Sequence, residues 1–249
     1  CGMSLACRAG RDMQCDSAFF SGLSNNDGGM AEYLRTTARA CVKLDPSTDP
    51  ADVAALADAG ITAYHAVRKA ASGLFPGTTA VVQGAGGLGH IGVQTLKAIT
   101  SAKVIVVDRN PAALELAKEI GADETVVSDG SHIDAVKDLT GGRGADVVFD
   151  FVAEQGAELD GWAMTAPAGY QYIIGYGGQF VAPTLDFVAG EKSVIGNIVG
   201  TYTDLAELMV LAQAGKVTLH TQKYPLSEAL TALADLDAGN VRGRAILVP

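Results

Sequence analysis

The sequence has few charged side chains, and few basic ones in particular. Asp, Glu, Lys and Arg make up 18% of the chain, below the roughly 25% of an average globular domain. Disorder driven by charge is therefore excluded for the chain as a whole. The 18 Lys and Arg are outnumbered by 28 Asp and Glu, which gives a net charge of −10. Such a chain is a poor partner for nucleic-acid phosphates, and we expect no nucleic acid among its ligands.

A long unbroken apolar segment is also missing. Residues 70–96 and 161–185 carry no formal charge, but glycine and proline interrupt both stretches, so neither predicts a membrane-spanning helix. The basic and apolar regions of a secretory signal do not open the sequence. We therefore expect a cytoplasmic protein with no membrane partner. Because the sequence begins with Cys1 rather than methionine, we expect it to be a fragment of a longer chain.

Glycine, by contrast, is abundant, with 30 of the 249 residues against a usual share of about 7%. From residue 78 onward, short apolar runs alternate with helical stretches. Predicted strands cover residues 79–82, 103–107, 124–127, 146–151, 170–174, 193–198, 217–224 and 245–248. Predicted helices cover residues 51–71, 91–99, 111–120, 131–139, 154–166, 203–214 and 227–236. Ser131 and Asp134 are predicted to form a capping pair at the start of the helix over 131–139. This alternation predicts an α/β fold with a parallel sheet.

The strongest motif is the run Gly84-Ala85-Gly86-Gly87-Leu88-Gly89, which fits G-x-G-x-x-G between a predicted strand and a predicted helix. Gly84 permits a tight turn, Gly86 lets the backbone approach a pyrophosphate, and Gly89 lets the helix pack close to the strand. Amide hydrogens at the start of a helix bind phosphate groups well. The turn, including Gly87 and Leu88, is therefore predicted to bind a dinucleotide.

An acid follows the motif at the expected distance. Asp108 ends the second predicted strand, nineteen residues after Gly89. A carboxylate there accepts hydrogen bonds from both ribose hydroxyls and repels a 2′-phosphate, which favours NAD over NADP. Arg109 favours NADP instead, because a guanidinium beside the ribose could bind that phosphate. An unrelated α/β protein with a glycine-rich turn and an exposed Asp108 is the alternative.

Cysteines cluster at the start of the sequence. Cys1, Cys7 and Cys15 are separated by six and eight residues. With a cysteine at Ser4, the pattern would be C-x2-C-x2-C-x7-C, which suits a tetrahedral structural zinc site. Serine is a poor zinc ligand at neutral pH. The lobe therefore binds metal weakly, with water, Asp12 or Asp16 as the fourth ligand, or it carries free thiols.

These motifs resemble those of the zinc-dependent alcohol dehydrogenases of the medium-chain dehydrogenase/reductase superfamily, especially the NAD-dependent bacterial secondary-alcohol type. The resemblance is carried over essentially the whole chain by the stretches CGMSLACRAGRDMQC, ADAGITAYHA, VVQGAGGLGHIGVQ, VIVVDRN, VFDFV and VRGRAILVP. It implies a Rossmann doubly wound parallel sheet flanked by remnants of a GroES-like catalytic domain. An NAD-binding domain would cover residues 59–201, and residues 1–58 and 202–249 would belong to the catalytic domain.

The resemblance also implies roles for individual residues. The cysteine lobe matches the family's structural zinc site, with Ser4 in place of one cysteine. Asp58 matches the third ligand of the catalytic zinc, and Thr62 matches a position against the nicotinamide. Phe151 and Val152 are implied near the adenosine, Ile174, Gly175 and Tyr176 along the nicotinamide, and Arg242 on the pyrophosphate.

The implied function is hydride transfer between a secondary alcohol or its ketone and NAD, with Zn²⁺ as Lewis acid, in a homodimer or homotetramer. In the family, a barrel with two more zinc ligands and a proton relay precedes the cysteine lobe. None of the four histidines takes over those roles, and His132 is expected to be exposed. We therefore expect the 249-residue chain alone to bind NAD but to be inactive.

Two other functions stay open. One is a zinc-free NADPH quinone reductase of the same superfamily, against which Asp108 and the cysteine lobe both argue. The other is a non-catalytic NAD-binding module that acts as a sensor or in oligomerisation.

Overall fold

The computed structural model describes residues 1–18, 20–23 and 27–249, which form two compact units. One unit contains residues 1–61 and 199–249, and the other contains residues 62–198. Among the described residues, no helix combines the length and the apolar character needed to cross a bilayer.

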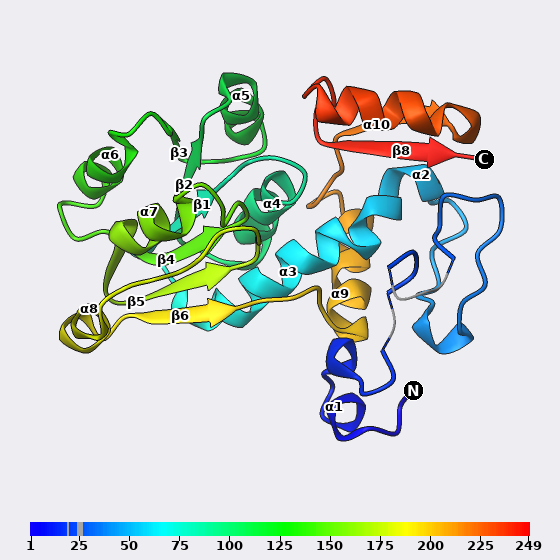
Figure 1. Cartoon of the computed structure of the whole chain (residues 1–249), viewed down its shortest axis with the longest axis horizontal. Helices are drawn as coiled ribbons and strands as arrows, with labels where there is room; N and C mark the ends of the chain where they lie inside the picture. The colour runs from blue at the N-terminus through cyan, green and yellow to red at the C-terminus, as the bar shows by residue number, and fades with distance from the viewer. Residues whose placement is uncertain (19, 24–26) are drawn as a thin grey trace. The chain divides into compact units, whose positions relative to one another are not determined.

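The unit of residues 62–198 is built on a six-stranded sheet (Figure 1). Its strands are β1 (Thr79–Gln83), β2 (Lys103–Asp108), β3 (Glu124–Val127), β4 (Ala145–Asp150), β5 (Thr165–Ile173) and β6 (Ser193–Gly196). Their order is β3-β2-β1-β4-β5-β6, and every neighbouring pair is parallel. This is the order of a doubly wound dinucleotide-binding sheet, so the predicted Rossmann fold is confirmed. The order reverses between β1 and β4, which is where ligands bind in such sheets.

Helices cover both faces of this sheet (Figure 1). They are α3 (Ala59–Ala70), which begins in the other unit, a 3₁₀ turn (Ala71–Gly73), α4 (Gly89–Ile99), α5 (Pro111–Glu119), α6 (His132–Leu139), α7 (Ala157–Met164) and α8 (Thr184–Gly190). Successive strand residues point to opposite faces. Val82 therefore packs with α3, α4 and α5, whereas Val81 packs with α6 and α7.

The unit of residues 1–61 and 199–249 contains short helices and a two-stranded parallel sheet. Its helices are α1 (Leu5–Arg8), α2 (Pro50–Val53), α9 (Tyr202–Gln213), α10 (Ala229–Asp237) and 3₁₀ turns at Asp12–Gln14, Ala38–Ala40, Ala54–Ala57 and Leu226–Glu228, and its strands are β7 (Thr221–Pro225) and β8 (Arg244–Val248). A capping box between Thr201 and Asp204 begins α9. The N–H of Tyr202 donates to the carboxylate of Asp12 (3.1 and 3.2 Å), which ties the N-terminal lobe to α9.

The predicted helix over residues 51–71 is wrong in its continuity. A 3₁₀ turn (Ala54–Ala57) and a break at Asp58, with φ −128° and ψ −70°, separate α2 from α3. The segment is rich in alanine, which has a high helix propensity. Propensity alone does not predict the tertiary packing that interrupts the helix. The strand predicted over residues 217–224 is likewise confined to β7.

The predicted helix over residues 154–166 is also shorter than expected. Ala153, Gln155 and Gly156 take positive φ values of +46°, +57° and +94°, so the helix starts only at Ala157. Its end is earlier too, because β5 already begins at Thr165. The sequence pattern did not predict α8.

Two expectations about α6 are corrected. Ser131 makes no side-chain cap, because its hydroxyl donates to the Asp129 carboxylate instead (2.7 Å). His132, expected to be exposed, is buried with 4% of its surface accessible. Its Nε2 lies 3.1 Å from Oδ2 of Asp160 on α7, which gives the ring a polar partner in the interior.

The sheet core makes a stability prediction. Phe149 is completely buried on β4, and its ring stacks on that of Tyr172 with centroids 5.4 Å apart. Replacement of Phe149 by Ala should lower the free energy of unfolding by about 3–5 kcal/mol, because it leaves a cavity in a packed interior. Urea denaturation measures the change. Phe75 is 59% exposed, so Phe75→Ala should change it by less than about 0.5 kcal/mol; equal effects of the two substitutions would contradict the assignment of the core.

Candidate functional site

The glycine-rich turn connects β1 to α4. Gly84 has a φ of +85° and donates its N–H to the carbonyl of Val107 on β2 (2.8 Å). This backbone conformation strains any residue with a side chain, so glycine is required there. The chain leaves the sheet at once and turns back into α4.

Gly89 and Gly86 differ in how much space surrounds them. A Cβ at Gly89 would lie 1.8 Å from the carbonyl oxygen of Gly84, so only glycine lets α4 begin this close to β1. A Cβ at Gly86 would meet nothing within 4 Å. The backbone at Gly86 is therefore open to an approaching ligand, while Gly89 fixes the start of the helix.

Asp108 holds the turn against the end of β2. Its Oδ2 accepts the N–H of Ala85 (2.7 Å), and its Oδ1 accepts the N–H of Asn110 (2.7 Å). The adjacent Arg109 is exposed, with Nη1 3.5 Å from Oε1 of Gln155. Both side chains therefore reach the region beyond the carboxyl ends of the strands.

The loops after β4 and β5 form the facing wall. The carbonyl of Asp150 accepts the N–H groups of Ile174 (2.9 Å) and Gly175 (3.0 Å), so the two loops run together. Phe151 and Val152 are partly buried, and Tyr176 is 93% exposed. A Cβ at Gly175 would lie 2.4 Å from the carbonyl oxygen of Val152, so no larger residue fits between the loops.

These segments enclose a cavity of about 690 Å³ within the unit of residues 62–198. Every predicted cofactor residue between Gly84 and Tyr176 lines this one cavity. The cavity also has lining residues that the sequence reasoning missed, and those with polar side chains outside the strands are Ser128, Glu154, Gln155 and Asp160. The first three follow β3 and β4, so the rule that strand ends face the ligand could have found them. Asp160 lies within α7, and no sequence signal distinguishes it.

The remaining predicted residues do not line this cavity. Asp58 is exposed between the 3₁₀ turn and α3, in the unit of residues 1–61 and 199–249. Arg242 is exposed ahead of β8 in the same unit. Thr62 is buried on α3 and belongs to the unit that holds the cavity, but is not part of its lining.

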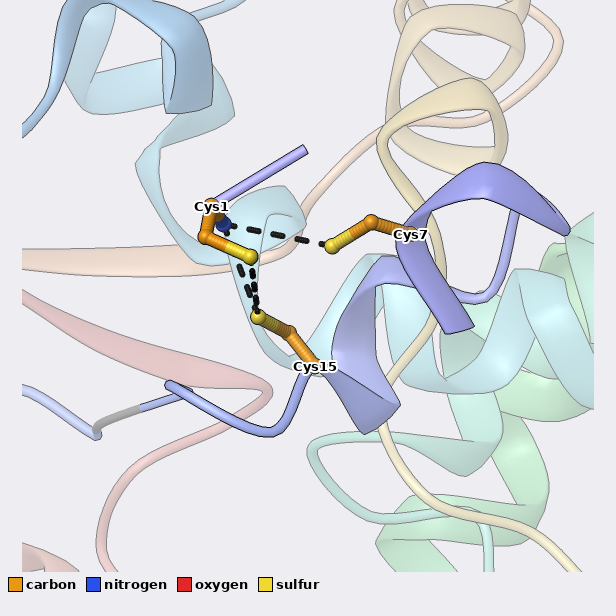
Figure 2. Close-up of side chains that lie close together, drawn as sticks. All are labelled: Cys1, Cys7 and Cys15. Carbon is orange, nitrogen blue, oxygen red and sulfur yellow. Dashed lines mark hydrogen bonds between the residues drawn. The ribbon is translucent and has the colours of Figure 1, made fainter. Parts of the chain in front are cut away.

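The three cysteines of the N-terminal lobe do converge (Figure 2). Their sulfur atoms all lie within 4.8 Å of one another, and the sulfurs of Cys1 and Cys15 are 3.4 Å apart. The N–H of Ser17 donates to the sulfur of Cys15 (3.4 Å). Mainly because this N–H stabilises the thiolate, the pKa of Cys15 is lowered to about 7.

A fourth zinc ligand is not provided by the described residues around this cluster. The Oγ of Ser4 accepts the N–H of Cys7 (3.2 Å) and caps α1, and a neutral hydroxyl is a weak zinc ligand. Neither Asp12 nor Asp16 belongs to the close group, and Asp12 binds the N–H of Tyr202 instead. The donor set thus fits a three-thiolate site rather than a closed four-thiolate one.

The chain is similar to curated proteins and solved structures over almost its whole length. The zinc-binding dehydrogenase family matches residues 87–214. An NAD-dependent alcohol dehydrogenase of Sulfurisphaera tokodaii is 34% identical over 98% of this chain and 70% of the relative. A D-arabinose 1-dehydrogenase (NADP(+)) of Saccharolobus solfataricus is 31% identical over 98% of this chain and 70% of the relative.

Among solved structures, the alcohol dehydrogenase of Aeropyrum pernix is 43% identical and superposes with a TM-score of 0.96, covering 100% of this chain and 73% of that one. The chain belongs to the zinc-binding dehydrogenase family. Within it, the chain is an oxidoreductase of the zinc alcohol dehydrogenase group of the medium-chain superfamily.

The cysteine lobe gives this family member a testable metal property. Ser4→Cys should complete a tetrahedral set of four thiolates, so the variant should keep about one zinc ion per chain after dialysis against a chelator. The unsubstituted protein should lose its zinc under the same conditions. Metal analysis by emission spectroscopy measures both. Ser47→Cys adds a thiol at an exposed position outside the lobe and should behave like the unsubstituted protein; zinc retention by that control, or zinc loss from Ser4→Cys, would contradict the assignment.

Proposed function

We propose that this chain is the cofactor-binding part of a dehydrogenase that transfers hydride between NAD and a small-molecule alcohol or ketone. The observation that carries the proposal is the cavity at the point where the strand order reverses, where the turn Gly84–Gly89 meets Asp108. The relatives named as NAD-dependent alcohol dehydrogenases support the substrate class.

The pyrophosphate of NAD fits the open side of the glycine-rich turn. Gly86 has no neighbour within 4 Å of where a Cβ would lie, so phosphate oxygens can approach the backbone there. The N-terminus of α4 opens on the same cavity, and its partial positive charge stabilises an anion. These features support binding of the diphosphate at residues 84–89.

The adenosine ribose fits beside Asp108. Each carboxylate oxygen of Asp108 accepts one backbone N–H and retains lone-pair capacity for a ribose hydroxyl. The negative charge opposes the 2′-phosphate of NADP. An NADP-dependent relative exists in the family, so the choice depends on such local charges, and Asp108 favours NAD in this chain.

The nicotinamide fits the wall made by residues 174–176, and Phe151 and Val152 on the adjoining loop are proposed to lie near the adenosine. Ile174 is buried, and Gly175 has no side chain, so an aromatic ring can lie against this wall. The role of these residues in hydride transfer is orientation: they hold the ring so that its reactive carbon faces the substrate.

Zinc enters the proposal through Asp58. When bound, a catalytic zinc supplies the Lewis acid that lowers the pKa of the alcohol. Among the described residues, Asp58 belongs to no close group of three or more metal ligands, and a single carboxylate does not fit a catalytic zinc site. We propose that Asp58 is one ligand of a site completed by chain segments outside these 249 residues.

Three further assignments belong to the same proposal. Residues 1–58 and 202–249 are proposed to form part of a catalytic domain, next to an NAD-binding domain at 59–201. Thr62 is proposed to contact the nicotinamide, and Arg242 the pyrophosphate, for which a guanidinium is well suited. The protein is proposed to act as a homodimer or homotetramer.

Asp108 generates a prediction about cofactor choice. Asp108→Ser removes the charge that repels the 2′-phosphate, so the affinity for NADPH relative to NADH should rise by about tenfold or more. Fluorescence titration with the two reduced cofactors measures the ratio. Asp134→Ser removes one charge from an exposed position of α6 and should leave the ratio unchanged. An unchanged ratio in Asp108→Ser would remove Asp108 from the ribose site.

Asp58 generates a prediction about turnover. Because one carboxylate does not retain catalytic zinc, the 249-residue chain should bind NADH but should not produce NADH steadily from a secondary alcohol, even with zinc added. The absorbance of the reduced nicotinamide follows the reaction. Sustained turnover by this purified chain would contradict the role given to the missing ligands.

A further inference from the structure

Asp150 is a buried acid whose role the proposed function leaves unexplained. It is the last residue of β4 and has no accessible surface. It pairs in register with Gln83 on β1 and with Ile173 on β5, so it lies in the middle of the sheet directly below the cavity.

Both loops that form the facing wall of the cavity are bonded to this one residue. The Oδ1 atom of Asp150 accepts the N–H groups of Val152 (2.9 Å) and Ala153 (2.8 Å). Its backbone carbonyl accepts those of Ile174 (2.9 Å) and Gly175 (3.0 Å). A change in the Asp150 side chain therefore reaches the loop after β4 directly, and the loop after β5 through their contact.

The loops after β4 and β5 restrict each other's movement. Ala153 has a φ of +46°, which costs energy for a residue with a side chain and needs bonds to hold it. Its carbonyl accepts the N–H of Gly178 (2.8 Å). The space between Val152 and Gly175 does not admit even a Cβ. Displacement of residues 151–153 would thus displace residues 174–178.

The second oxygen of Asp150 lacks a hydrogen-bond partner among the described residues, and so does Oε2 of Glu158, which is 6% exposed. The Glu158 carboxylate lies against Gly178, with oxygens 2.7 and 2.9 Å from where its Cβ would be. Asp160 adds a third carboxylate on α7, held by His132 of α6. Burial raises the pKa of Asp150 most. The N–H groups of Ala153 and Val152 oppose this shift, and the charges of Glu158 and Asp160 add to it, so the pKa is raised overall.

An ionised Asp150 would be a buried charge beside two other acids. Its partners in the structure are backbone N–H groups, and no cation of the described residues forms an ion pair with it or with Glu158. Burial of an unpaired charge costs far more than burial of a neutral acid. A neutral carboxyl still accepts the two N–H groups through Oδ1.

We propose that Asp150 is a positioning residue that, as the neutral acid, holds residues 151–153 and 174–175 in the conformation that receives the cofactor. The proposal rests on the proposed function, because it assigns the cavity to a dinucleotide. Asp150 itself does not line the cavity; it acts through the loops that do.

The test compares Asp150→Asn with Asp150→Ser by fluorescence titration of NADH. Asparagine has the shape of the neutral acid and keeps an acceptor at Oδ1, so its dissociation constant should stay within about threefold of that of the unsubstituted protein. Serine is too short to accept both N–H groups, and its dissociation constant should rise by about tenfold or more. Circular dichroism should show both variants folded.

Asp146 provides a matched control at the other end of β4. Its Oδ2 accepts the N–H of Thr79 (2.8 Å), so it too bonds a backbone amide, but it does not line the cavity. Asp146→Ser should leave NADH affinity unchanged. Weaker binding in that control as large as in Asp150→Ser would show a general loss of stability and would overturn the proposal, as would normal binding by Asp150→Ser.

A pH series tests the neutral form even if Asp150→Ser does not fold. NADH affinity of the unsubstituted protein should fall as the pH rises through the pKa of Asp150, because the neutral acid is lost; Asp150→Asn has no proton to lose there and should not show this fall. Parallel profiles, or an Asn variant that binds as weakly as the Ser variant, would overturn the proposal. If the unsubstituted protein binds no NADH, the proposed function fails, and amide exchange then tests the loop bonds by themselves. Faster exchange over residues 151–155 and 174–178 in Asp150→Ser than in Asp150→Asn and Asp146→Ser supports these bonds, and equal exchange in the three variants overturns them.

Discussion

The cofactor face of the sheet depends on how closely the start of α4 approaches the end of β1. The hypothetical Cβ of Gly89 falls 1.8 Å from the carbonyl oxygen of Gly84, a distance that no side chain tolerates. This contact lets the chain reverse within a few residues and brings the first turn of α4 to the edge of the cavity. The hydrogen bond from Gly84 to Val107 then fixes the turn to β2, and hence to Asp108. The positions proposed to bind the diphosphate and the ribose are therefore set by one steric constraint.

The sequence predicted this region well because its signals are local. Glycine at fixed offsets, an apolar strand before it and an acid at the end of the next strand all report backbone geometry within one βαβ unit. The sheet order follows from the same alternation of strands and helices. The convergence of Cys1, Cys7 and Cys15 was also predicted, since all three lie within the first fifteen residues.

The errors arose where tertiary contacts decide the outcome. Composition gives no reason for Ala153 and Gln155 to adopt positive φ, and this conformation makes α7 begin later than predicted. At Ala153 the conformation is held by a hydrogen bond from its N–H to the buried Asp150. His132 is buried because Asp160, on the next helix, meets its ring. Asp160 itself reaches the cavity from the middle of a helix, and such a position has no pattern of its own.

Asp108 joins cofactor choice to the integrity of the backbone. The same two oxygens that we propose favour NAD also accept the N–H groups of Ala85 and Asn110. Removal of the acid, as in Asp108→Ser, changes the ratio of the two affinities, but it also takes an acceptor from the glycine-rich turn and from the start of α5. A redesign that seeks tight binding of a 2′-phosphate therefore has a second requirement besides the change of charge: the new side chain has to bond both amides.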